Sequence, residues 1–169
     1  MDIVERLART RIGSTHNQYA RSELRCARLR AHIAERTNAR IVLVGEAAGY
    51  RGARISGVPF TSERQLTGTG PGEATATIVH RVLQELGVED DVLLWNVVPT
   101  HPGTCDSNRR PTCVEVRAAR PFLDELTRGR RIVAVGRLAA SVLDAPYVRH
   151  PSYGGATAFA AGLQRMLGA

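Results

Sequence analysis

Four short apolar runs, separated by segments of helical character, constrain the fold of this chain more than any other feature of its sequence. The first run reads IVLV and contains no polar residue, which is typical of a strand buried on both faces of a sheet. Because predicted strands and helices alternate along the chain, we predict a three-layer α/β/α fold with a central, mainly parallel four-stranded sheet. The predicted strands are residues 41–44, 91–95, 131–136 including a terminal turn, and 146–149.

The segments between and around these strands carry helix signals, with apolar side chains at helical spacing. One helix start is marked by Thr112, because Glu115 follows three residues later and would complete a capping box. Pro121 is expected to kink that helix or to begin a second one. The other helices are predicted at residues 2–36 (one or two helices), 73–86, 137–143 and 156–167.

The chain is basic, and its positive charge comes from arginine alone. It has 23 basic and 16 acidic residues, no lysine and a formal net charge of +7. Arginine binds phosphate through two parallel hydrogen bonds, so the excess favours a polyanionic partner. An arginine bias from a GC-rich genome explains the same excess equally well. The N-terminal arginines are expected to form a solvated face; they stand at positions 21, 25, 28, 30 and 36.

Chain length, cysteine usage and hydropathy narrow the class of protein. A chain of 169 residues suits one domain, and we predict a single domain over residues 1–169. Cys26, Cys105 and Cys113 are odd in number and lack CxxC spacing, which argues against a disulfide framework and a structural zinc site. Since the sequence has no signal segment and no apolar run of bilayer length, we expect a cytoplasmic protein without a membrane partner.

Polar and aromatic residues follow the predicted strands, at the edge where open parallel sheets bind ligands. Gly45 and Glu46 follow the first strand, Asn96 the second and His150 the fourth, while Phe60 lies on the loop after the first. A turn-capping asparagine and an ordinary loop histidine would look the same in sequence. The loop after the first strand also holds glycines that are expected to let a ligand approach the backbone, at positions 49, 52 and 57.

These residue types together suit the cleavage of an N-glycosidic bond. An amide presents a donor and an acceptor to the edge of a nucleobase, and an aromatic ring stacks on its face. A histidine can donate to an oxygen that gains negative charge, and a carboxylate can orient a water. We therefore predict an enzyme that flips a nucleotide out of DNA and hydrolyses the bond between base and sugar.

The sequence resembles the uracil-DNA glycosylase superfamily, most closely the branch whose first motif reads GEAPG. The resemblance rests on four stretches in the family's order: GEAAG at 45–49, GVPF at 57–60, WNVV at 95–98 and HPS at 150–152. It implies a monomeric DNA repair hydrolase that acts on uracil and leaves an abasic site. The implied catalytic residues are Glu46 and His150, and the implied base-binding residues are Gly45, Ala47, Phe60 and Asn96, with Tyr50 against the methyl group of thymine.

The resemblance also implies where DNA binds. Ser152 is expected to contact a phosphate, and Tyr153 or the adjacent Gly154 to enter the minor groove as a wedge. Arginines near the predicted rim are expected to hold further phosphates, and DNA binding should then depend on salt. They are Arg51, Arg54, Arg109 and Arg149.

Three departures from the family pattern change the expected chemistry. The GEAPG branch generally carries a four-cysteine iron–sulfur cluster, but Thr100 and Ala119 stand where its later cysteines would align, so we expect no cofactor. Ala48 replaces the proline of the motif. Ala47 occupies the position of an aspartate in other branches, so Glu46 is expected to activate water less directly. The absence of lysine predicts a monofunctional enzyme without lyase activity.

Other functions fit parts of this pattern. A glycosylase for hypoxanthine or xanthine would use the same residue types, and a lesion-binding or single-strand-binding protein of this fold would keep the pocket without turnover. A nucleotide-binding protein is disfavoured, because neither GxxxxGK[ST] nor GxGxxG follows a predicted strand. A zinc deaminase is also disfavoured, since no His-x-Glu occurs with a cysteine pair.

Overall fold

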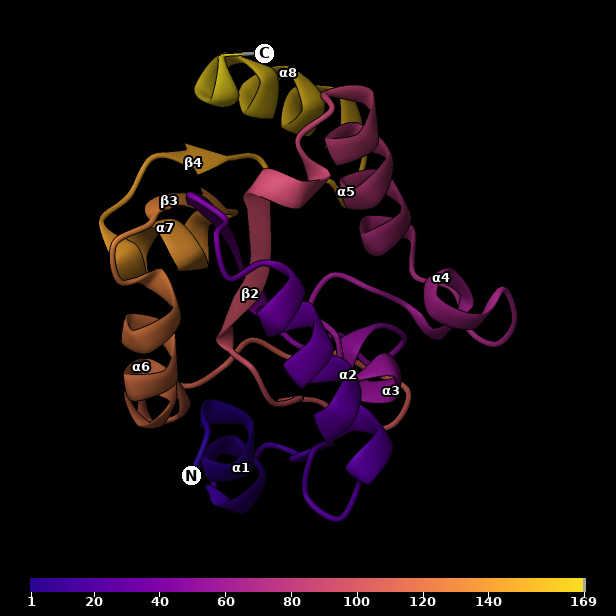
Figure 1. Ribbon diagram of the computed structural model, residues 1–169, viewed down its shortest axis with the longest axis vertical. Coiled ribbons are helices and arrows are strands. Elements are labelled where there is room, and N and C mark those ends of the chain that lie inside the picture. Colours follow the sequence, from indigo (N-terminus) through magenta and orange to yellow (C-terminus); the bar gives the residue numbers. More distant parts are fainter. Residues whose placement is uncertain (169) are drawn as a thin grey trace.

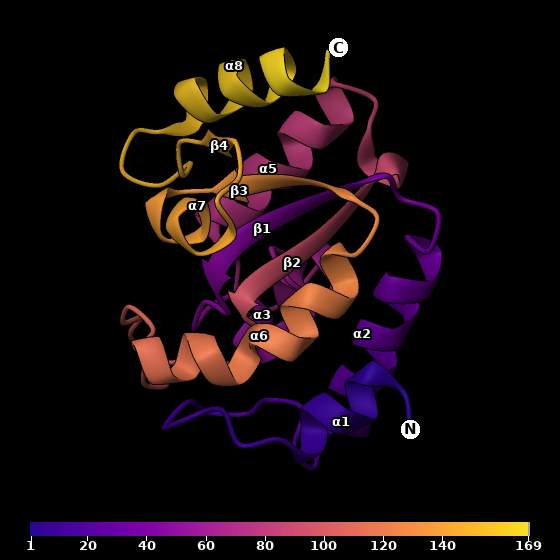
Figure 2. The same ribbon diagram turned by 90° about the vertical axis from the view of Figure 1, so that its left-hand side faces the viewer.

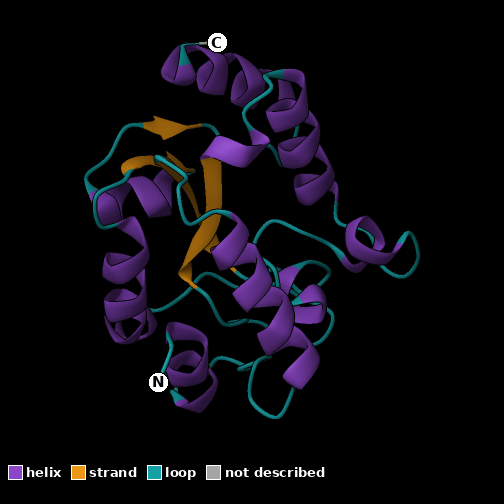
Figure 3. Cartoon of the chain, in the orientation of Figure 1, coloured by secondary structure: helices purple, strands orange, loops and turns teal. Residues whose placement is uncertain are grey.

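The computed structural model describes residues 1–168 and contains one four-stranded sheet in the order β2-β1-β3-β4, with every neighbouring pair parallel (Figures 1 and 3). The predicted three-layer α/β/α architecture is confirmed. The strands are β1 Ile41–Ala47, β2 Val92–Val98, β3 Arg131–Val135 and β4 Tyr147–Val148.

The first two strands run three residues further than predicted. Gly45 pairs with Asn96 and Ala47 with Val98, so polar positions that we expected in loops belong to the ladder. Apolar periodicity ends at Val44, but backbone pairing continues because hydrogen bonds between strands do not depend on side-chain polarity. Glu46 and Asn96 therefore start from rigid strand backbone.

Helices cover both faces of the sheet (Figure 2). Alternate residues of β1 belong to different cores: Val42 and Val44 pack on one face and Leu43 on the other. The first core is covered by α1 Ile3–Arg9, α2 Glu23–Glu35, α6 Cys113–Thr127 and α7 Arg137–Leu143. The second is covered by α5 Ala74–Glu85 and α8 Ala156–Leu167. Three short helices lie between β1 and β2: α3 Ala53–Ser56, α4 Glu63–Thr67 and the 3-10 helix η1 Glu89–Asp91.

The predicted capping box of α6 is present, and the helix continues through Pro121 without a second start. The Thr112 hydroxyl accepts from the Glu115 N–H at 3.3 Å, and a Glu115 carboxylate oxygen accepts from the Thr112 N–H at 2.9 Å. This end of α6 anchors the loop of residues 103–111, which reaches the sheet edge where the candidate site lies.

The expectation of a solvated N-terminal arginine face is wrong for three of its residues, and one of them is Arg36, whose Nε donates to the Glu89 carbonyl at 2.9 Å. Arg28 donates two hydrogen bonds to the carboxylate of Glu63, at 2.8 and 2.9 Å. The Arg25 Nε donates to the Ile55 carbonyl at 2.8 Å. Arg25 and Arg28 therefore fix the segment between β1 and β2, which carries Phe60. No helix among residues 1–168 combines the length and the apolar character needed to cross a membrane.

Candidate active site

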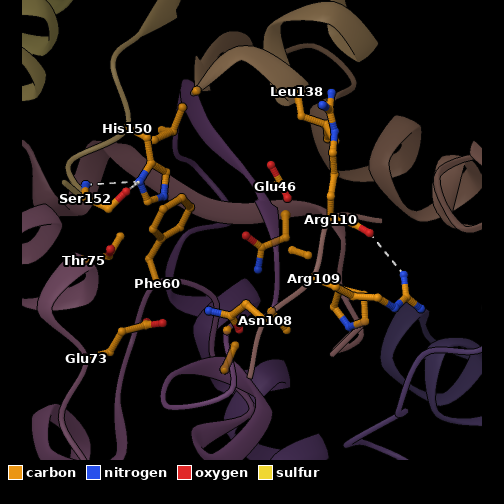
Figure 4. A pocket seen from close by; sticks show the side chains of 18 of the residues that line it. Glu46, Phe60, Glu73, Thr75, Asn108, Arg109, Arg110, Leu138, His150 and Ser152 are labelled. Atoms are coloured by element: carbon orange, nitrogen blue, oxygen red, sulfur yellow. Dashed lines mark hydrogen bonds between the residues drawn. The ribbon is translucent and has the colours of Figure 1, made fainter. Parts of the chain in front are cut away.

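A pocket of about 480 Å³ opens at the carboxyl ends of the strands (Figure 4). In the strand order β2-β1-β3-β4, the chain reverses direction of winding between β1 and β3, and such a reversal creates a crevice at the sheet edge. Residues from the ends of all four strands and from three loops line the pocket. They include Glu46, Ala47, Gly49, Phe60, Glu73, Thr75, Asn96, Asn108, Arg110, Gly136, Arg137, His150, Ser152 and Tyr153.

Gly45, Phe60 and Asn96 form one unit of this pocket. A Cβ atom on Gly45 would lie 2.4 Å from Phe60 Cζ and 3.0 Å from Asn96 Oδ1, so only glycine allows the ring and the amide to sit this close to β1. Gly45 itself does not line the pocket; its role is to make room. Phe60 is 8% exposed and Asn96 is 3% exposed. Within residues 1–168, no group hydrogen-bonds the Asn96 side chain, so this nearly buried amide faces the pocket with its donors and acceptor free.

The loop that carries Phe60 is held under backbone strain. Phe60 has φ of +53°, a conformation that non-glycine residues rarely adopt. The buried Ser56 closes the loop, because its hydroxyl donates to the Thr61 carbonyl at 2.6 Å. The Thr61 hydroxyl in turn lies 3.0 Å from Nε2 of His80 on α5. Strained residues fixed in this way are concentrated at functional sites, and here the strain sets the position of the ring.

His150 lies just after β4 and is oriented by Ser152. The Ser152 N–H donates to His150 Nδ1 at 3.2 Å, and the Ser152 hydroxyl lies 2.7 Å from the same nitrogen. Because Nδ1 accepts a hydrogen bond, the neutral ring carries its proton on Nε2, which makes no hydrogen bond to residues 1–168. Burial lowers the pKa of His150. The pocket therefore receives a neutral imidazole with a free Nε2–H donor (Figure 4).

Glu46, at the end of β1, contributes a carboxyl group without a hydrogen-bond partner among the described residues. Burial raises its pKa, and the Arg110 guanidinium opposes that rise. Both side chains line the pocket, and Figure 4 shows them on the same side of it, away from Glu73. A carboxyl group with a raised pKa in a pocket is a candidate for proton transfer or for orienting a water.

A second carboxyl group, that of Glu73, enters the pocket from the N-terminal end of α5, and our sequence analysis missed it. A Cβ atom on Gly49 would lie 2.2 Å from Glu73 Oε1, and one on Gly52 would lie 2.2 Å from Oε2. These two glycines therefore make room for Glu73. Gly49 also lines the pocket, whereas Gly52 does not, so the expectation that it receives a ligand fails there. The third glycine, Gly57, has φ of +81° and packs against Arg25, so the expectation fails there too.

The loop of residues 103–111 closes the pocket from the other side. The ring nitrogens of the buried His101 bridge the carbonyl oxygens of Ala48 and Thr104, at 2.7 and 2.6 Å, and so join this loop to the end of β1. The Asn108 Oδ1 accepts from the Tyr50 N–H at 2.9 Å, and the Asn108 NH₂ group makes no hydrogen bond within residues 1–168. The loop is thus tied to the first motif at two points.

Arg109, which we predicted as a phosphate ligand, is paired within the fold. Its guanidinium donates to both carboxylate oxygens of Glu115, at 2.8 and 2.6 Å. Glu115 also accepts from the Ser14 hydroxyl and the Thr112 N–H, and it is 1% exposed. Arg109 is the main cause that lowers the pKa of Glu115 to about 2.

Two other arginines, Arg110 and Arg137, line the pocket and make no side-chain hydrogen bond or ion pair to residues 1–168. Sequence reasoning missed both as candidates for phosphate contact. Arg137 could have been found, because it directly follows the turn after β3 and the strand-end rule applies to it. Glu73 had no such signal, since it follows a glycine-rich segment far from any strand end in sequence.

The remaining predicted residues are divided between the pocket and the outer surface. Ala47, Ser152 and Tyr153 line the pocket, and Tyr153 is 97% exposed at its mouth with φ of +52°. The structure places the other four outside the lining, on the surrounding surface: Tyr50, Arg51, Arg149 and Gly154.

Tyr50 does not form a wall of the pocket. Its ring lies under the exposed guanidinium of Arg51, which is 5.8 Å from the ring centroid, and Tyr50 is not among the residues that line the pocket. Arg149 is exposed and donates to the Tyr153 carbonyl at 3.3 Å, which supports the Tyr153 loop from behind.

The chain was compared with known families and structures. Residues 33–164 match the family described as the uracil DNA glycosylase superfamily. Among solved structures, the chain is similar to wild-type SMUG2 of Pedobacter heparinus, with a TM-score of 0.69 and 13% sequence identity over 99% of this chain and 97% of that chain. At this identity the likeness shows a shared fold. No curated protein sequence matches.

Proposed function

We propose that this chain, which belongs to the uracil DNA glycosylase superfamily, hydrolyses the N-glycosidic bond of uracil in DNA and leaves an abasic site. The observation that carries the proposal is the free, nearly buried amide of Asn96 beside the ring of Phe60, with the free Nε2–H of His150 in the same pocket. These three groups match the edge, the face and the leaving-group oxygen of a flat lactam base.

Base recognition starts from Asn96. Uracil presents an N3–H donor and an O4 acceptor side by side, and a carboxamide offers the complementary acceptor and donor. Cytosine presents the reverse pattern and would pair only with an amide that is turned by 180°. The ring of Phe60, held in place by the loop described above, offers the face on which the base stacks.

His150 stabilises the departing base in this proposal. As the C1′–N1 bond breaks, its electron pair moves into the base and negative charge appears on O2. A neutral imidazole that donates from Nε2 stabilises that oxygen without giving up its proton, and Ser152 holds the ring in the required tautomer. The lowered pKa of His150 keeps the ring neutral over a wider pH range.

Glu46 and water complete the hydrolysis. The sugar gains positive charge at C1′, and an ionised Glu46 stabilises this charge and orients the attacking water. The water oxygen bonds to C1′, one of its protons passes to solvent through Glu46, and the base anion is protonated after release. Arg110 favours the ionised form of Glu46 through its positive charge.

DNA is held at the mouth of the pocket. The unpaired guanidinium groups of Arg110 and Arg137 are suited to the phosphates next to the flipped nucleotide. Tyr153, which is exposed at the tip of its loop, is suited to fill the space that the nucleotide leaves in the duplex. We further propose that the enzyme is monofunctional, because the chain has no lysine side chain to form a Schiff base.

The test is a cleavage assay on labelled oligonucleotides with one uracil, hypoxanthine or xanthine, followed by alkali. We expect strand scission at uracil, reduced about 10²–10³-fold by His150→Ala while thermal unfolding stays unchanged. Scission only at hypoxanthine or xanthine would mean that the substrate is a deaminated purine, while the type of reaction would stay as proposed. Binding of the oligonucleotides without scission of any lesion would contradict an enzymatic function.

A further inference from the structure

Glu73 is a polar group of the pocket that the proposed reaction does not use. It is partly buried, lines the pocket, and makes no side-chain hydrogen bond within residues 1–168. A carboxyl group that only stabilises the fold is normally paired, because an unpaired buried polar group costs free energy. Burial raises the pKa of Glu73, with no positive charge to oppose it. The residues that the structure describes thus leave this carboxyl group of the pocket without a partner.

The position of Glu73 relative to a base follows from the order of the strands, given the proposed function. Asn96 is on β2 and His150 follows β4, and these are the two outermost strands of the sheet. A uracil whose O2 faces His150 directs C5 away from it, because C2 and C5 are opposite positions of the ring. Atom C5 therefore points toward the outer edge at β2.

The first motif lies next to β2, because it ends β1, the strand that pairs with β2. Ala47 pairs with Val98 of β2, and the Ala48 N–H donates to the Val98 carbonyl at 3.3 Å. Gly49 comes next, and Glu73 fills the space that a side chain at Gly49 would occupy. In Figure 4 the ring of Phe60 lies between His150 and Glu73. A base bound in this orientation would direct C5 toward the carboxyl group of Glu73, which lines the pocket.

We propose that Glu73 is the residue with which this pocket distinguishes uracil from thymine. The C5–H of uracil leaves room for water to reach the carboxyl group. The methyl group of thymine removes that water and offers no hydrogen bond, so the carboxyl group is left unpaired in contact with carbon. A pyrimidine with a hydrogen-bond donor at C5, such as a hydroxymethyl group, would instead be accepted. Selection against thymine by polarity differs from selection by a bulky ring, the role that we had predicted for Tyr50.

The test compares two side chains of similar length, in Glu73→Gln and Glu73→Met, in single-turnover assays on oligonucleotides with uracil, thymine or 5-hydroxymethyluracil. Glutamine keeps a polar wall and should preserve the ratio of the uracil rate to the thymine rate. Methionine removes the polarity at similar volume and should lower that ratio about tenfold to a hundredfold. It should also remove any activity on 5-hydroxymethyluracil. Tyr50→Ala is the matched control and should leave the ratio unchanged.

The inference is overturned if Glu73→Met, folded by circular dichroism, keeps the wild-type ratio, or if Tyr50→Ala alone lowers it. A binding measurement separates this result from a failure of the proposed function. Oligonucleotides with non-cleavable 2′-fluoro analogues of deoxyuridine and thymidine are titrated by fluorescence anisotropy. If no variant releases a base but Glu73→Met still removes the preference for the uracil analogue, the proposed reaction fails and the role of Glu73 stands. Equal binding of both analogues by the wild type contradicts the role of Glu73.

Discussion

The glutamates of this protein are of two kinds, which differ in their hydrogen-bond partners and in the direction of their pKa shifts. Glu115, at the start of α6, accepts hydrogen bonds from Arg109, Ser14 and Thr112, and its pKa is lowered to about 2. Glu46 and Glu73, in the pocket, have no hydrogen-bond partner within residues 1–168, and burial raises the pKa of each.

The difference lies in what surrounds each carboxyl group. Glu115 is the most buried of the three, yet it is the most strongly ionised, because charge-assisted hydrogen bonds outweigh the cost of its burial. The pocket glutamates lack such bonds, although Arg110 lies close enough to Glu46 to lower its pKa. Their free hydrogen-bonding capacity is therefore available to a ligand. The comparison therefore distinguishes the carboxylate of Glu115, which stabilises the fold, from those of Glu46 and Glu73, which are available to bind a substrate.

The strongest test of this separation is Glu46→Gln. The amide cannot ionise, so we expect base release to fall about 10²–10⁴-fold, the range for loss of a general acid or base. The free energy of unfolding should not fall, because Glu46 has no partner to lose. Single-turnover assays and urea denaturation on the same preparations measure both quantities. A large loss of stability would mean that Glu46 stabilises the fold as Glu115 does, and it would contradict the distinction between the two kinds of glutamate.

Glu115→Gln should show the opposite pattern. It removes the ion pair with Arg109, and we expect the free energy of unfolding to fall by about 3 kcal/mol. Base release by the folded fraction should fall much less than in Glu46→Gln. Urea denaturation at pH 7 gives the first quantity, and Arg120→Gln is a control because its pair with Asp124 is exposed on the same helix. A variant as stable as the wild type would contradict the structural role of Glu115.

The same ion pair predicts a dependence of stability on pH. The folded-state pKa of Glu115 is about 2, below its ordinary value of 4.5. Its contribution is therefore fully present above pH 4.5 and is lost as the pH falls toward 2; it amounts to roughly 3 kcal/mol. Urea denaturation between pH 6 and pH 2 should show a steeper loss of stability for the wild type than for Glu115→Gln. Parallel curves would contradict this assignment.

Much of the fold could be predicted because its signals are local. The apolar runs placed all four strands, and the capping box placed the start of α6. The strand-end rule brought Glu46, Asn96 and His150 into one pocket, since the carboxyl ends of parallel strands share an edge. These predictions need only periodicity and the direction of the chain.

The parts that could not be predicted depend on contacts between distant segments. Arg109 could not be assigned to Glu115 from charge alone, because exposed and paired arginines look alike in sequence. Glu73 reaches the pocket only because α5 begins there, and the glycines that receive it lie more than twenty positions earlier. Tyr50 follows the first motif directly, yet it does not line the pocket.

The arginines extend the comparison of paired and unpaired side chains. Arg110 and Arg137 line the pocket and have no side-chain partner among residues 1–168, whereas Arg109 is bound to Glu115. Each of the variants Arg110→Gln and Arg137→Gln should lose one phosphate contact. In each, the slope of log Kobs for DNA binding against log[salt] should become shallower by about 1. Arg9→Gln, at an exposed site on α1, should leave the slope unchanged. An unchanged slope in both pocket variants would show that neither arginine contacts a phosphate.

The smallest expected effect is on the stability of Glu73→Gln, and it completes the contrast with Glu115→Gln. Burial raises the pKa of Glu73 in the folded state, so ionisation above its ordinary value of 4.5 favours the unfolded chain. Replacing the carboxyl group with a neutral amide of the same shape should therefore increase the free energy of unfolding at pH 7, by no more than about 1 kcal/mol. Below pH 4 both proteins carry a neutral side chain and should be equally stable. Urea denaturation at the two pH values measures the difference. A loss of stability at pH 7 would mean that Glu73 has a partner in the fold after all, and that its place in the wall is structural.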